Sequence, residues 1–395
     1  MNPDLEKLQP YPFEKLAALK AGITPPAQPH IALSIGEPKH PAPEFVLATL
    51  RDNLGQLSVY PNSKGLPELR EAIAAWATQR FQLQQLDPET QVLPVAGTRE
   101  ALFSFAQAIV DRSQNPVVIA PNPFYQIYEG AAYLAGAQPY FVNCLAQNRF
   151  LPDFAAVPED VWRRCQLLYI CSPGNPTGAV LGADTLRQLL ELADRYDFVI
   201  ASDECYSEIY FDDAKPPLGL LQLCHQSGRD DYRRCVVFHS LSKRSNLPGL
   251  RSGFVAGDAA LLKKYLLYRT YHGCALPIPT QLASIAAWND EAHVRANRDL
   301  YRQKFDAVLQ ILSGRLDVAK PDAGFYLWAG TPTDDREFTR ELFRCENITV
   351  LPGQFLARDA NGSNPGERRV RMALVATLDE CVTAAQRIAR CLDSQ

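Results

Sequence analysis

The chain has 395 residues, of which 47% are hydrophobic and 21% charged, so it is long enough for two or three domains and too apolar to be disordered. Its 40 basic and 44 acidic side chains give a net charge of −4, which disfavours nucleic acid and anionic lipid as partners. No run of about 18 apolar residues predicts a membrane span. The ten cysteines form no C-x-x-C pair and the first twenty residues contain no unbroken apolar core, so we predict a reduced, cytoplasmic protein.

The amino-terminal forty residues are broken by prolines, at positions 10, 12, 25, 26 and 29. Proline interrupts the hydrogen bonding of helices and strands, so this stretch is unsuited to fold as a domain of its own. We expect it to pack against a smaller lobe formed by the carboxy-terminal part of the chain.

Short apolar runs recur through the middle of the chain and predict buried strands. They are Pro116–Ala120, Pro139–Val142, Leu167–Cys171, Phe198–Ser202, Cys235–His239 and Gly253–Ala256. Apolar residues at helical spacing precede or separate them, for example over 102–109 and 186–193. This alternation predicts an α/β fold with a mostly parallel central sheet sandwiched by helices.

Residues 281–312 contain no proline or glycine and predict one long helix that bridges two lobes. Strand-like and helical segments then alternate in a smaller α+β lobe. The strands are expected at Phe325–Trp328, Thr349–Leu351 and Val370–Leu374, and the helices at Asp335–Arg344 and Leu378–Leu392. We therefore predict a large domain over 41–285 and a small domain formed by 1–40 and 286–395, with the bridging helix at about 281–312.

Several common ligand motifs are absent. No two glycines stand two positions apart, so the G-x-G-x-x-G dinucleotide fingerprint is missing, and the G-x-x-x-x-G-K-[ST] phosphate loop is missing too. The six histidines show no H-E-x-x-H or other close ligand spacing. The sequence therefore predicts neither a classical Rossmann or P-loop site nor a catalytic metal.

Three polar loops each follow a predicted strand, where an open parallel sheet gathers its ligand contacts. The first, Ser172–Gly178, is a rigid turn that carries Asn175. The second begins with Asp203 at the end of a buried strand. A carboxylate there is costly unless a cation or a protonated group meets it, and the residues alone leave open whether that partner is an arginine or a ligand.

The third loop, Ser240–Gly253, contains Ser240, Ser242, Lys243 and Arg251. Two hydroxyls and a guanidinium make a plausible anion site beside an amine. The start of the loop also matches S-x-x-K, the acyl-serine signature of penicillin-binding proteins and β-lactamases. That alternative requires S-D-N and K-T-G tripeptides, and neither occurs in the chain.

Together and in this order, the loops resemble those of the class I/II aminotransferases, fold-type I enzymes that depend on pyridoxal 5′-phosphate. Three further stretches extend the resemblance over essentially the whole chain. They are Gly36-Glu37-Pro38, the Y-x4-G-x3-L-R element of Tyr60, Gly65, Leu69 and Arg70, and Gly97-Thr98-Arg99-Glu100-Ala101. The resemblance implies a large domain that binds the cofactor and a smaller α+β domain.

The resemblance also implies chemical roles in the loops. Lys243 is expected to link covalently to the cofactor aldehyde and then to carry the substrate α-proton. Asp203 is expected to keep the pyridine nitrogen protonated, while Asn175 and Tyr206 hydrogen-bond the ring hydroxyl oxygen. Lys243, Asp203 and Tyr206 are thus the predicted catalytic residues. Tyr125 matches the aromatic residue that stacks on the cofactor ring.

The cofactor phosphate is expected to meet hydroxyls, backbone amides and an arginine. The predicted residues are Gly97, Thr98, Arg99, Ser240, Ser242 and Arg251. Arg99 replaces the small residue usual at its position, so its side chain either reaches the phosphate or turns to solvent. Tyr60 resembles the tyrosine that reaches the phosphate of the neighbouring subunit, which implies a homodimer with shared active sites.

The substrate α-carboxylate needs a planar, bidentate partner, and a guanidinium has that shape. Arg371 matches the family position for this role. Gly36 and Asn175 are expected beside it. A solvated charge or a surface ion pair is the alternative for any single arginine.

Longer stretches are similar to the succinyldiaminopimelate transaminases of proteobacteria. They lie at 10–16, 36–40, 202–210 and 268–274. This resemblance implies ping-pong amino transfer between glutamate, which becomes 2-oxoglutarate, and N-succinyl-2-amino-6-oxopimelate, in diaminopimelate and lysine biosynthesis. Lys39, His40, Arg269 and His272 are candidates for the far end of the substrate, against the simpler interpretation that each faces solvent.

Three alternatives are weighed against this one. A class I/II aminotransferase for aspartate, alanine or acetylornithine-type substrates would share the motifs, and a C–S lyase would keep Lys243, Asp203 and Arg371. A regulator that senses amino acids would be expected to carry a basic DNA-binding module ahead of this domain. The resemblance begins within the first sixteen residues, so no such module is expected.

Overall fold

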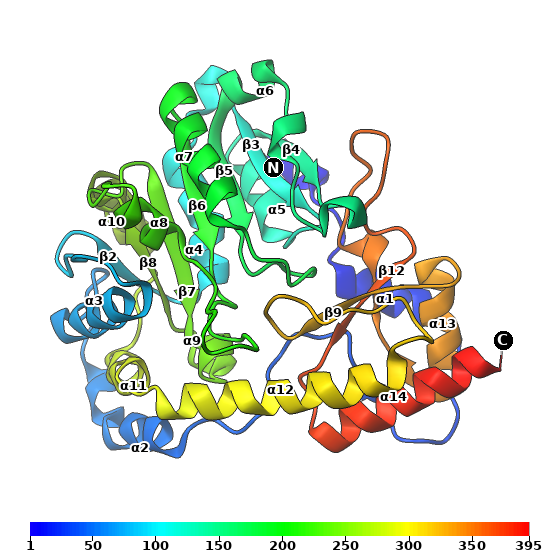
Figure 1. The fold of residues 1–395 in the computed structure, drawn as a ribbon. Coiled ribbons are helices and arrows are strands. Elements are labelled where there is room, and N and C mark those ends of the chain that lie inside the picture. Colours follow the sequence, from blue (N-terminus) through cyan, green and yellow to red (C-terminus); the bar gives the residue numbers. More distant parts are fainter. Residues whose placement is uncertain (395) are drawn as a thin grey trace.

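A computed structural model describes residues 1–394, and its largest element is a seven-stranded sheet (Figure 1). In sheet order the strands are β2 Val92–Val95, β8 Gly253–Gly257, β7 Cys235–Ser240, β6 Val199–Asp203, β5 Cys165–Cys171, β3 Val117–Asn122 and β4 Gln138–Asn143. Neighbouring strands from β7 to β4 are parallel, and β8 is antiparallel to both of its neighbours. The predicted mostly parallel α/β sheet is therefore confirmed.

Helices surround this sheet and continue into the second lobe. The α-helices are α1 Pro12–Lys20, α2 Glu44–Asp52, α3 Pro67–Phe81, α4 Thr98–Ile109, α5 Ile127–Leu134, α6 Glu159–Arg164, α7 Ala183–Tyr196, α8 Leu220–Gln226, α9 Leu241–Arg244, α10 Ala259–His272, α11 Ile278–Trp288, α12 Ala292–Leu312, α13 Asp335–Glu346 and α14 Leu378–Asp393. Short 3-10 helices are η1 Pro3–Lys7, η2 Leu54–Ser58, η3 Arg112–Gln114, η4 Ala146–Asn148, η5 Phe154–Ala156, η6 Pro248–Leu250 and η7 Gly353–Phe355.

The sheet is buried on both faces, and this explains why its strands read as continuous apolar runs. Successive side chains of β5 enter different cores, with Leu168 and Ile170 in one and Leu167 and Tyr169 in the other. Helices α3, α7, α8 and α11 cover the first face, whereas α4, α5 and α10 cover the second. The two layers of helices hold the polar loops at the carboxyl ends of the parallel strands.

The smaller lobe contains a three-stranded antiparallel sheet in the order β11-β12-β9. Its strands are β11 Leu351–Pro352, β12 Arg369–Ala373 and β9 Tyr326–Gly330. Strand β1 (Ile31–Ala32) pairs in parallel with β10 (Ile348–Thr349), and α1 packs against α13 and β11. The amino-terminal segment therefore packs against this lobe, as predicted.

The predicted continuous helix over 281–312 is wrong, because the structure divides it into α11 and α12. The break falls at Asn289-Asp290-Glu291, where α11 closes with a hydrogen bond from the Asn289 amide to the Ile285 carbonyl. The carboxylate of Asp290 accepts a hydrogen bond from the His293 amide at 2.9 Å and so caps the start of α12. Polar side chains end the helix here without proline or glycine.

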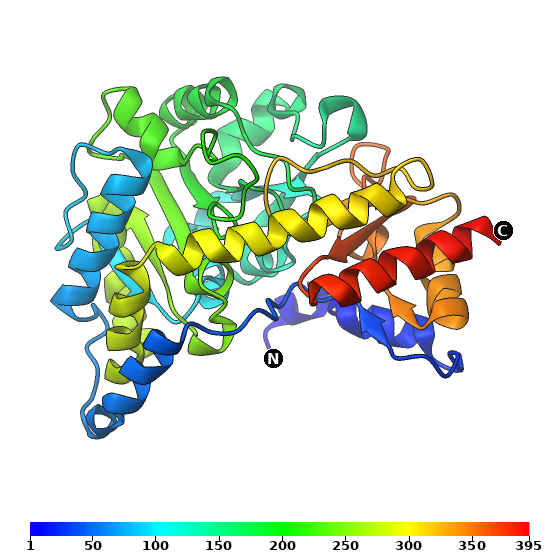
Figure 2. The ribbon, with the colours of Figure 1, turned by 60° about the horizontal axis from the view of Figure 1, so that its bottom comes forward.

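Helix α12 runs along the underside of both lobes in Figure 1, and the turned view of Figure 2 shows it packed beside α14. In the chain it lies between α11, which packs on the large sheet, and β9 of the smaller lobe. The division into a domain over 41–285 and a domain of 1–40 plus 286–395 stays a prediction. Within residues 1–394, none of the helices combines the length and the apolar content needed to cross a bilayer.

Candidate active site

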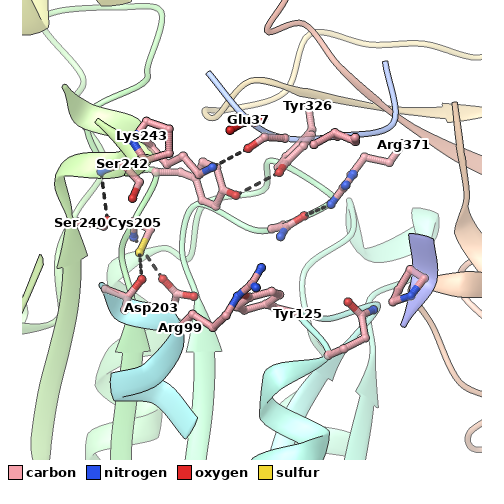
Figure 3. A pocket seen from close by; sticks show the side chains of 18 of the residues that line it. Glu37, Arg99, Tyr125, Asp203, Cys205, Ser240, Ser242, Lys243, Tyr326 and Arg371 are labelled. Carbon is pink, nitrogen blue, oxygen red and sulfur yellow. Dashed lines mark hydrogen bonds between the residues drawn. The ribbon is translucent and has the colours of Figure 1, made fainter. Parts of the chain in front are cut away.

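The three polar loops converge on one cavity of about 530 Å³ between the lobes (Figure 3). Most of the residues singled out from the sequence line it. They are Gly36, Thr98, Arg99, Tyr125, Asn175, Asp203, Tyr206, Ser240, Ser242, Lys243, Arg251 and Arg371. Gly97 lies directly behind this wall, at the residue before α4. The carboxyl ends of β5, β6 and β7 therefore meet strand β12 of the other lobe around a shared space.

Lys243 projects into the cavity from the four-residue helix α9. Ser240, at the end of β7, caps this helix by accepting a hydrogen bond from the Ser242 amide at 3.1 Å. The Lys243 ammonium donates to the Gly36 carbonyl at 2.5 Å, and within residues 1–394 it has no carboxylate within 4.0 Å. Burial lowers the pKa of Lys243 from 10.5 to about 8, which makes the neutral amine accessible near physiological pH.

Asp203 is the last residue of β6 and only 4% exposed. Its carboxylate accepts hydrogen bonds from the Tyr128 hydroxyl at 2.7 Å and the Cys205 amide at 3.3 Å. No arginine, lysine or histidine of the described chain lies within ion-pair distance of it, so the pairing with an arginine considered from the sequence is absent. Burial raises the pKa of Asp203, and a cation entering the cavity would favour its ionised form.

Arg371 reaches the cavity from the opposite lobe, on β12 (Figure 3). Its guanidinium donates to the Ser34 carbonyl at 2.7 Å and to Oδ1 of Asn175 at 3.0 Å, and it lies 4.5 Å from the centre of the Tyr326 ring. Nε of Arg371 is buried without a hydrogen-bond partner among residues 1–394. A buried guanidinium without a carboxylate partner fits a site for an anionic ligand.

The side chain of Arg99 is exposed and lies against two tyrosines, and its contact with a phosphate stays a prediction. Its Nε donates to the Tyr125 hydroxyl at 2.6 Å, and Nη2 lies 3.5 Å from the Tyr11 hydroxyl. Phenol oxygens are weaker partners for a guanidinium than carboxylates. Arg99 is therefore a second cation at the mouth of the cavity that an anion could engage.

The wall near α4 and η6 forms a cradle suited to a phosphate. Gly97 has φ of +85°, and a Cβ there would collide with Nη2 of Arg251. Helix α4 begins at Thr98, and its N-cap residue Gly97 has no side chain to cap it, so a bound anion could accept hydrogen bonds from its first backbone amides. The hydroxyls of Ser240 and Ser242 line the same cavity. These donors, together with Lys243 and the unpaired Asp203, fit a phosphorylated pyridine aldehyde.

Some of the singled-out residues lie elsewhere in the single chain. Tyr60 is fully exposed and outside the cavity. Lys39 and His272 are also exposed, and Arg269 is buried in an ion pair with Glu100. Neither these three residues nor His40 lines the cavity. The candidates named for the far end of the substrate are thus not placed in the cavity by one chain alone.

Two tyrosines that contact predicted site residues were not identified from the sequence. Tyr128 of α5 donates to Asp203, and the Tyr326 hydroxyl lies 3.1 Å from the Tyr206 hydroxyl. Both tyrosines are surrounded by apolar residues, a context typical of core packing. The sequence contains no signal that separates a tyrosine of the core from one that donates a hydrogen bond to a buried carboxylate.

Comparisons with known proteins agree with this geometry. A family model described as aminotransferase class I and II matches residues 28–388. An LL-diaminopimelate aminotransferase from Dehalococcoides mccartyi is 32% identical over 378 residues, covering 94% of this chain and 93% of the relative. The structure of an aminotransferase from Neisseria meningitidis is similar with 51% identity, a TM-score of 0.95 and 99% coverage of both chains. A probable N-succinyldiaminopimelate aminotransferase from Thermus thermophilus is 28% identical with a TM-score of 0.84, covering 96% of this chain and 100% of that one.

Proposed function

Because the chain belongs to the class I and II aminotransferases, which depend on pyridoxal 5′-phosphate, we propose that it moves an amino group between glutamate and N-succinyl-2-amino-6-oxopimelate. One observation supports this most. Lys243, Asp203 and Arg371 line one cavity, the first partly buried and the other two buried, and none of them has a partner of opposite charge within 4.0 Å in residues 1–394. Unpaired charges in such a place are costly, so a ligand that pairs with all three accounts for them.

When bound, the cofactor supplies an electron sink for the charge that develops at the substrate α-carbon. Asp203 would hold a proton on the pyridine nitrogen, because a cation there relieves its unpaired carboxylate. Lys243 would link to the cofactor aldehyde and, once released, move the α-proton. The lowered pKa of Lys243, about 8, suits an amine that acts as both nucleophile and base.

The remaining cavity residues would hold and orient the cofactor. Its phosphate would lie in the cradle formed by Gly97, Thr98, Ser240, Ser242 and Arg251. The other expected contacts are the ring hydroxyl with Tyr206 and with the amide nitrogen of Asn175, the ring face with Tyr125, and the phosphate with Tyr60 of a second copy of the chain. The last contact requires a homodimer, which is typical of the family.

Both proposed substrates carry at least two carboxylates, and the cavity has two cations besides Lys243 and Arg251. Arg371 would bind the α-carboxylate beside Gly36 and Asn175, because its guanidinium is held by Asn175 and lacks a carboxylate partner. Arg99 would engage the second carboxylate from the Tyr125 side. The Dehalococcoides and Thermus relatives, both named for diaminopimelate compounds, support a long dicarboxylic substrate. On this proposal the enzyme serves diaminopimelate and lysine biosynthesis in the cytoplasm.

The two half-reactions test this function separately. Glutamate added to the purified holoenzyme should shift the cofactor absorbance to that of the amino form, and 2-oxoglutarate should be released in equal amount. The aminated enzyme should then convert N-succinyl-2-amino-6-oxopimelate with a higher kcat/KM than oxaloacetate, pyruvate or acetylornithine-type semialdehydes.

A preference for one of those other acceptors would retain the aminotransferase and reject the succinylated substrate. No absorbance shift with glutamate or any other amino donor, together with elimination from cystathionine-type substrates, would favour a C–S lyase instead.

A further inference from the structure

The segment Gly36–His40 is connected to Lys243 at both of its ends, directly at Gly36 and through Asn297 at His40. At one end the Gly36 carbonyl accepts a hydrogen bond from Nζ of Lys243 at 2.5 Å. At the other end His40 points away from the cavity, toward Asn297 and Lys304 of helix α12. His40 therefore lies where the amino-terminal segment crosses the helix that bridges the lobes.

The position of Asn297 fixes where the protons of His40 lie. Nδ2 of Asn297 is 3.3 Å from the Lys243 carbonyl and 3.4 Å from the Arg244 carbonyl. Carbonyl oxygens only accept, so the amide nitrogen must face them and Oδ1 must face His40, whose Nδ1 is 2.7 Å away. Because Oδ1 also only accepts, His40 must carry a proton on Nδ1.

Lys304 lies on the other side of the His40 imidazole, next to Nε2. Its Nζ lies 2.5 Å from Nε2 of His40 and 3.4 Å from the Val375 carbonyl. The side chain is nearly fully buried, and no carboxylate of the described chain lies within 4.0 Å. A neutral imidazole protonated on Nδ1 has its lone pair on Nε2, so the Lys304 ammonium donates to it and to Val375.

We propose that Lys304, His40 and Asn297 are positioning residues. Their hydrogen bonds run in one direction, donor to acceptor, from the Lys304 ammonium through His40 and Asn297 to the Lys243 carbonyl, and the same ammonium also donates to the Val375 carbonyl. Val375 follows β12, four residues after Arg371. The chain of bonds thus joins the strand that carries the proposed carboxylate receptor to the helix that carries the proposed reacting amine. This inference rests on the proposed role of Lys243 and goes beyond it by naming what holds that residue in register with Arg371.

The groups around this chain favour the neutral imidazole. The Tyr301 ring packs on His40 with 4.7 Å between ring centres and lies 5.0 Å from Nζ of Lys304, and its hydroxyl is buried without a partner among residues 1–394. From α14, Glu380 and Cys381 act on Lys304 at longer range. Burial lowers the pKa of His40, and the neighbouring ammonium lowers it further. A second proton on the ring would set an N–H against an ammonium in a buried space.

The first test observes the ring directly in the wild-type holoenzyme. Nitrogen-15 NMR of histidine-labelled protein, with the His40 signals assigned by their loss in His40→Gln, should show the Nδ1–H tautomer at pH 7.5. An Nε2–H tautomer or a doubly protonated ring would overturn the proposal. This measurement does not depend on turnover, so it stays valid whatever reaction the enzyme performs.

The second test is kinetic and uses a matched pair of variants on α12. Lys304→Met removes the hydrogen-bond donor and the buried charge but keeps an apolar side chain of similar length. The fold should therefore persist, and the melting temperature checks this. We expect kcat to fall roughly tenfold with KM changed less than twofold, because a displaced lysine slows chemistry more than binding. Asn297→Leu should behave alike, and Tyr301→Phe, which deletes an unpartnered hydroxyl, should retain wild-type kcat.

Wild-type kcat in folded Lys304→Met would refute the positioning role, as would an equal loss in Tyr301→Phe. If Lys243 itself proves not to be the reacting amine, the kinetic part fails with the proposed function, whereas the tautomer measurement still decides whether the chain of hydrogen bonds exists.

Discussion

The cost of a charge held away from water explains the composition of the cavity better than any single motif. Lys243, Asp203 and Arg371 come from different elements, yet Lys243 is partly buried, the other two are buried, and each meets only neutral partners in the described chain. Replacing such groups with apolar ones would usually stabilise a fold. Their presence is therefore a property of the site and not of the core.

The burial of Lys243 predicts how the stability of the protein without its cofactor depends on pH. Its pKa of about 8, against 10.5 for an exposed lysine, means that the unfolded chain holds the proton more tightly. Burying the ammonium then costs about 3 kcal/mol at pH 7, and the cost fades as the pH rises from about 8 toward 10.5. Lys243→Met should therefore raise the free energy of unfolding of the apoprotein at pH 7. This gain over the wild type should become progressively smaller above pH 8. Urea titrations at fixed protein concentration across this range measure it, and a gain independent of pH would argue against the buried ammonium.

Arg99 and Arg371 can be separated by the number of carboxylates on the keto acid. Arg371→Leu should raise KM for both 2-oxoglutarate and pyruvate by roughly 10- to 100-fold, because hydrogen bonds to a charged group are lost. Arg99→Met should raise KM for 2-oxoglutarate but leave that for pyruvate within about twofold. Steady-state kinetics with the two acceptors provide the comparison. If Arg99→Met changed KM equally for 2-oxoglutarate and for pyruvate, Arg99 would not be the residue that binds the second carboxylate.

At the level of single residues, the sequence predicted the need of Asp203 for a partner from its place at a strand end. It did not predict Tyr128, because a tyrosine on the apolar face of α5 has the pattern of a core residue. His40 was considered for the substrate on its sequence neighbourhood alone, whereas its side chain turns to α12. In an irregular segment, the direction in which a side chain points depends on tertiary packing. The spacing of residues along the sequence does not encode that direction.

At the level of elements, the parallel strands were predictable because burial on both faces requires apolar residues at every position. Strand β2 was not, since Pro94 interrupts its run and is tolerated only because the strand lies at the sheet edge. The single predicted strand near 349–351 is two, with Thr349 ending β10 and Leu351 beginning β11. The boundary between these two strands exists because they join different sheets, and that pairing is set by the tertiary fold.

The break between α11 and α12 has a measurable energetic signature. Asp290→Ala removes the carboxylate that accepts from the His293 amide, so the free energy of unfolding should fall by about 1 kcal/mol. Asp299→Ala on the same helix removes only an exposed ion pair with Arg302 and should change stability by less than about 0.5 kcal/mol. Denaturant unfolding compares the two variants. Equal losses would mean that Asp290 does not cap α12.

At the level of the whole molecule, the exposed apolar side chains near η2 suit the proposed homodimer. Leu54, Leu57, Val59 and Tyr60 are each at least half exposed. The last three line a surface groove together with Pro277 and Ile278. Scattered exposed apolar residues are common, but a contiguous cluster of this kind is typical of an interface. The cluster also contains the tyrosine that the family resemblance assigns to the neighbouring active site.

Substitution within this cluster should separate the subunits. Leu57→Asp buries a charge in the proposed interface, so sedimentation velocity should show a shift from dimer toward monomer and weaker retention of the cofactor. Leu300→Asp, at an exposed leucine of α12 away from the cluster, serves as the control and should stay dimeric. A wild-type chain that sediments as a monomer, or a Leu57→Asp dimer of wild-type stability, would contradict the shared site.

The central claim is that Lys243 is the one amine that binds the cofactor covalently, opposite Asp203 in a common cavity. Borohydride reduction of the holoenzyme, followed by peptide mass spectrometry, examines this most directly. The account predicts a pyridoxyl group on the peptide that contains Lys243 and its absence from Lys243→Met protein. A pyridoxyl group on another lysine, such as the buried Lys304, or on no peptide at all would contradict it.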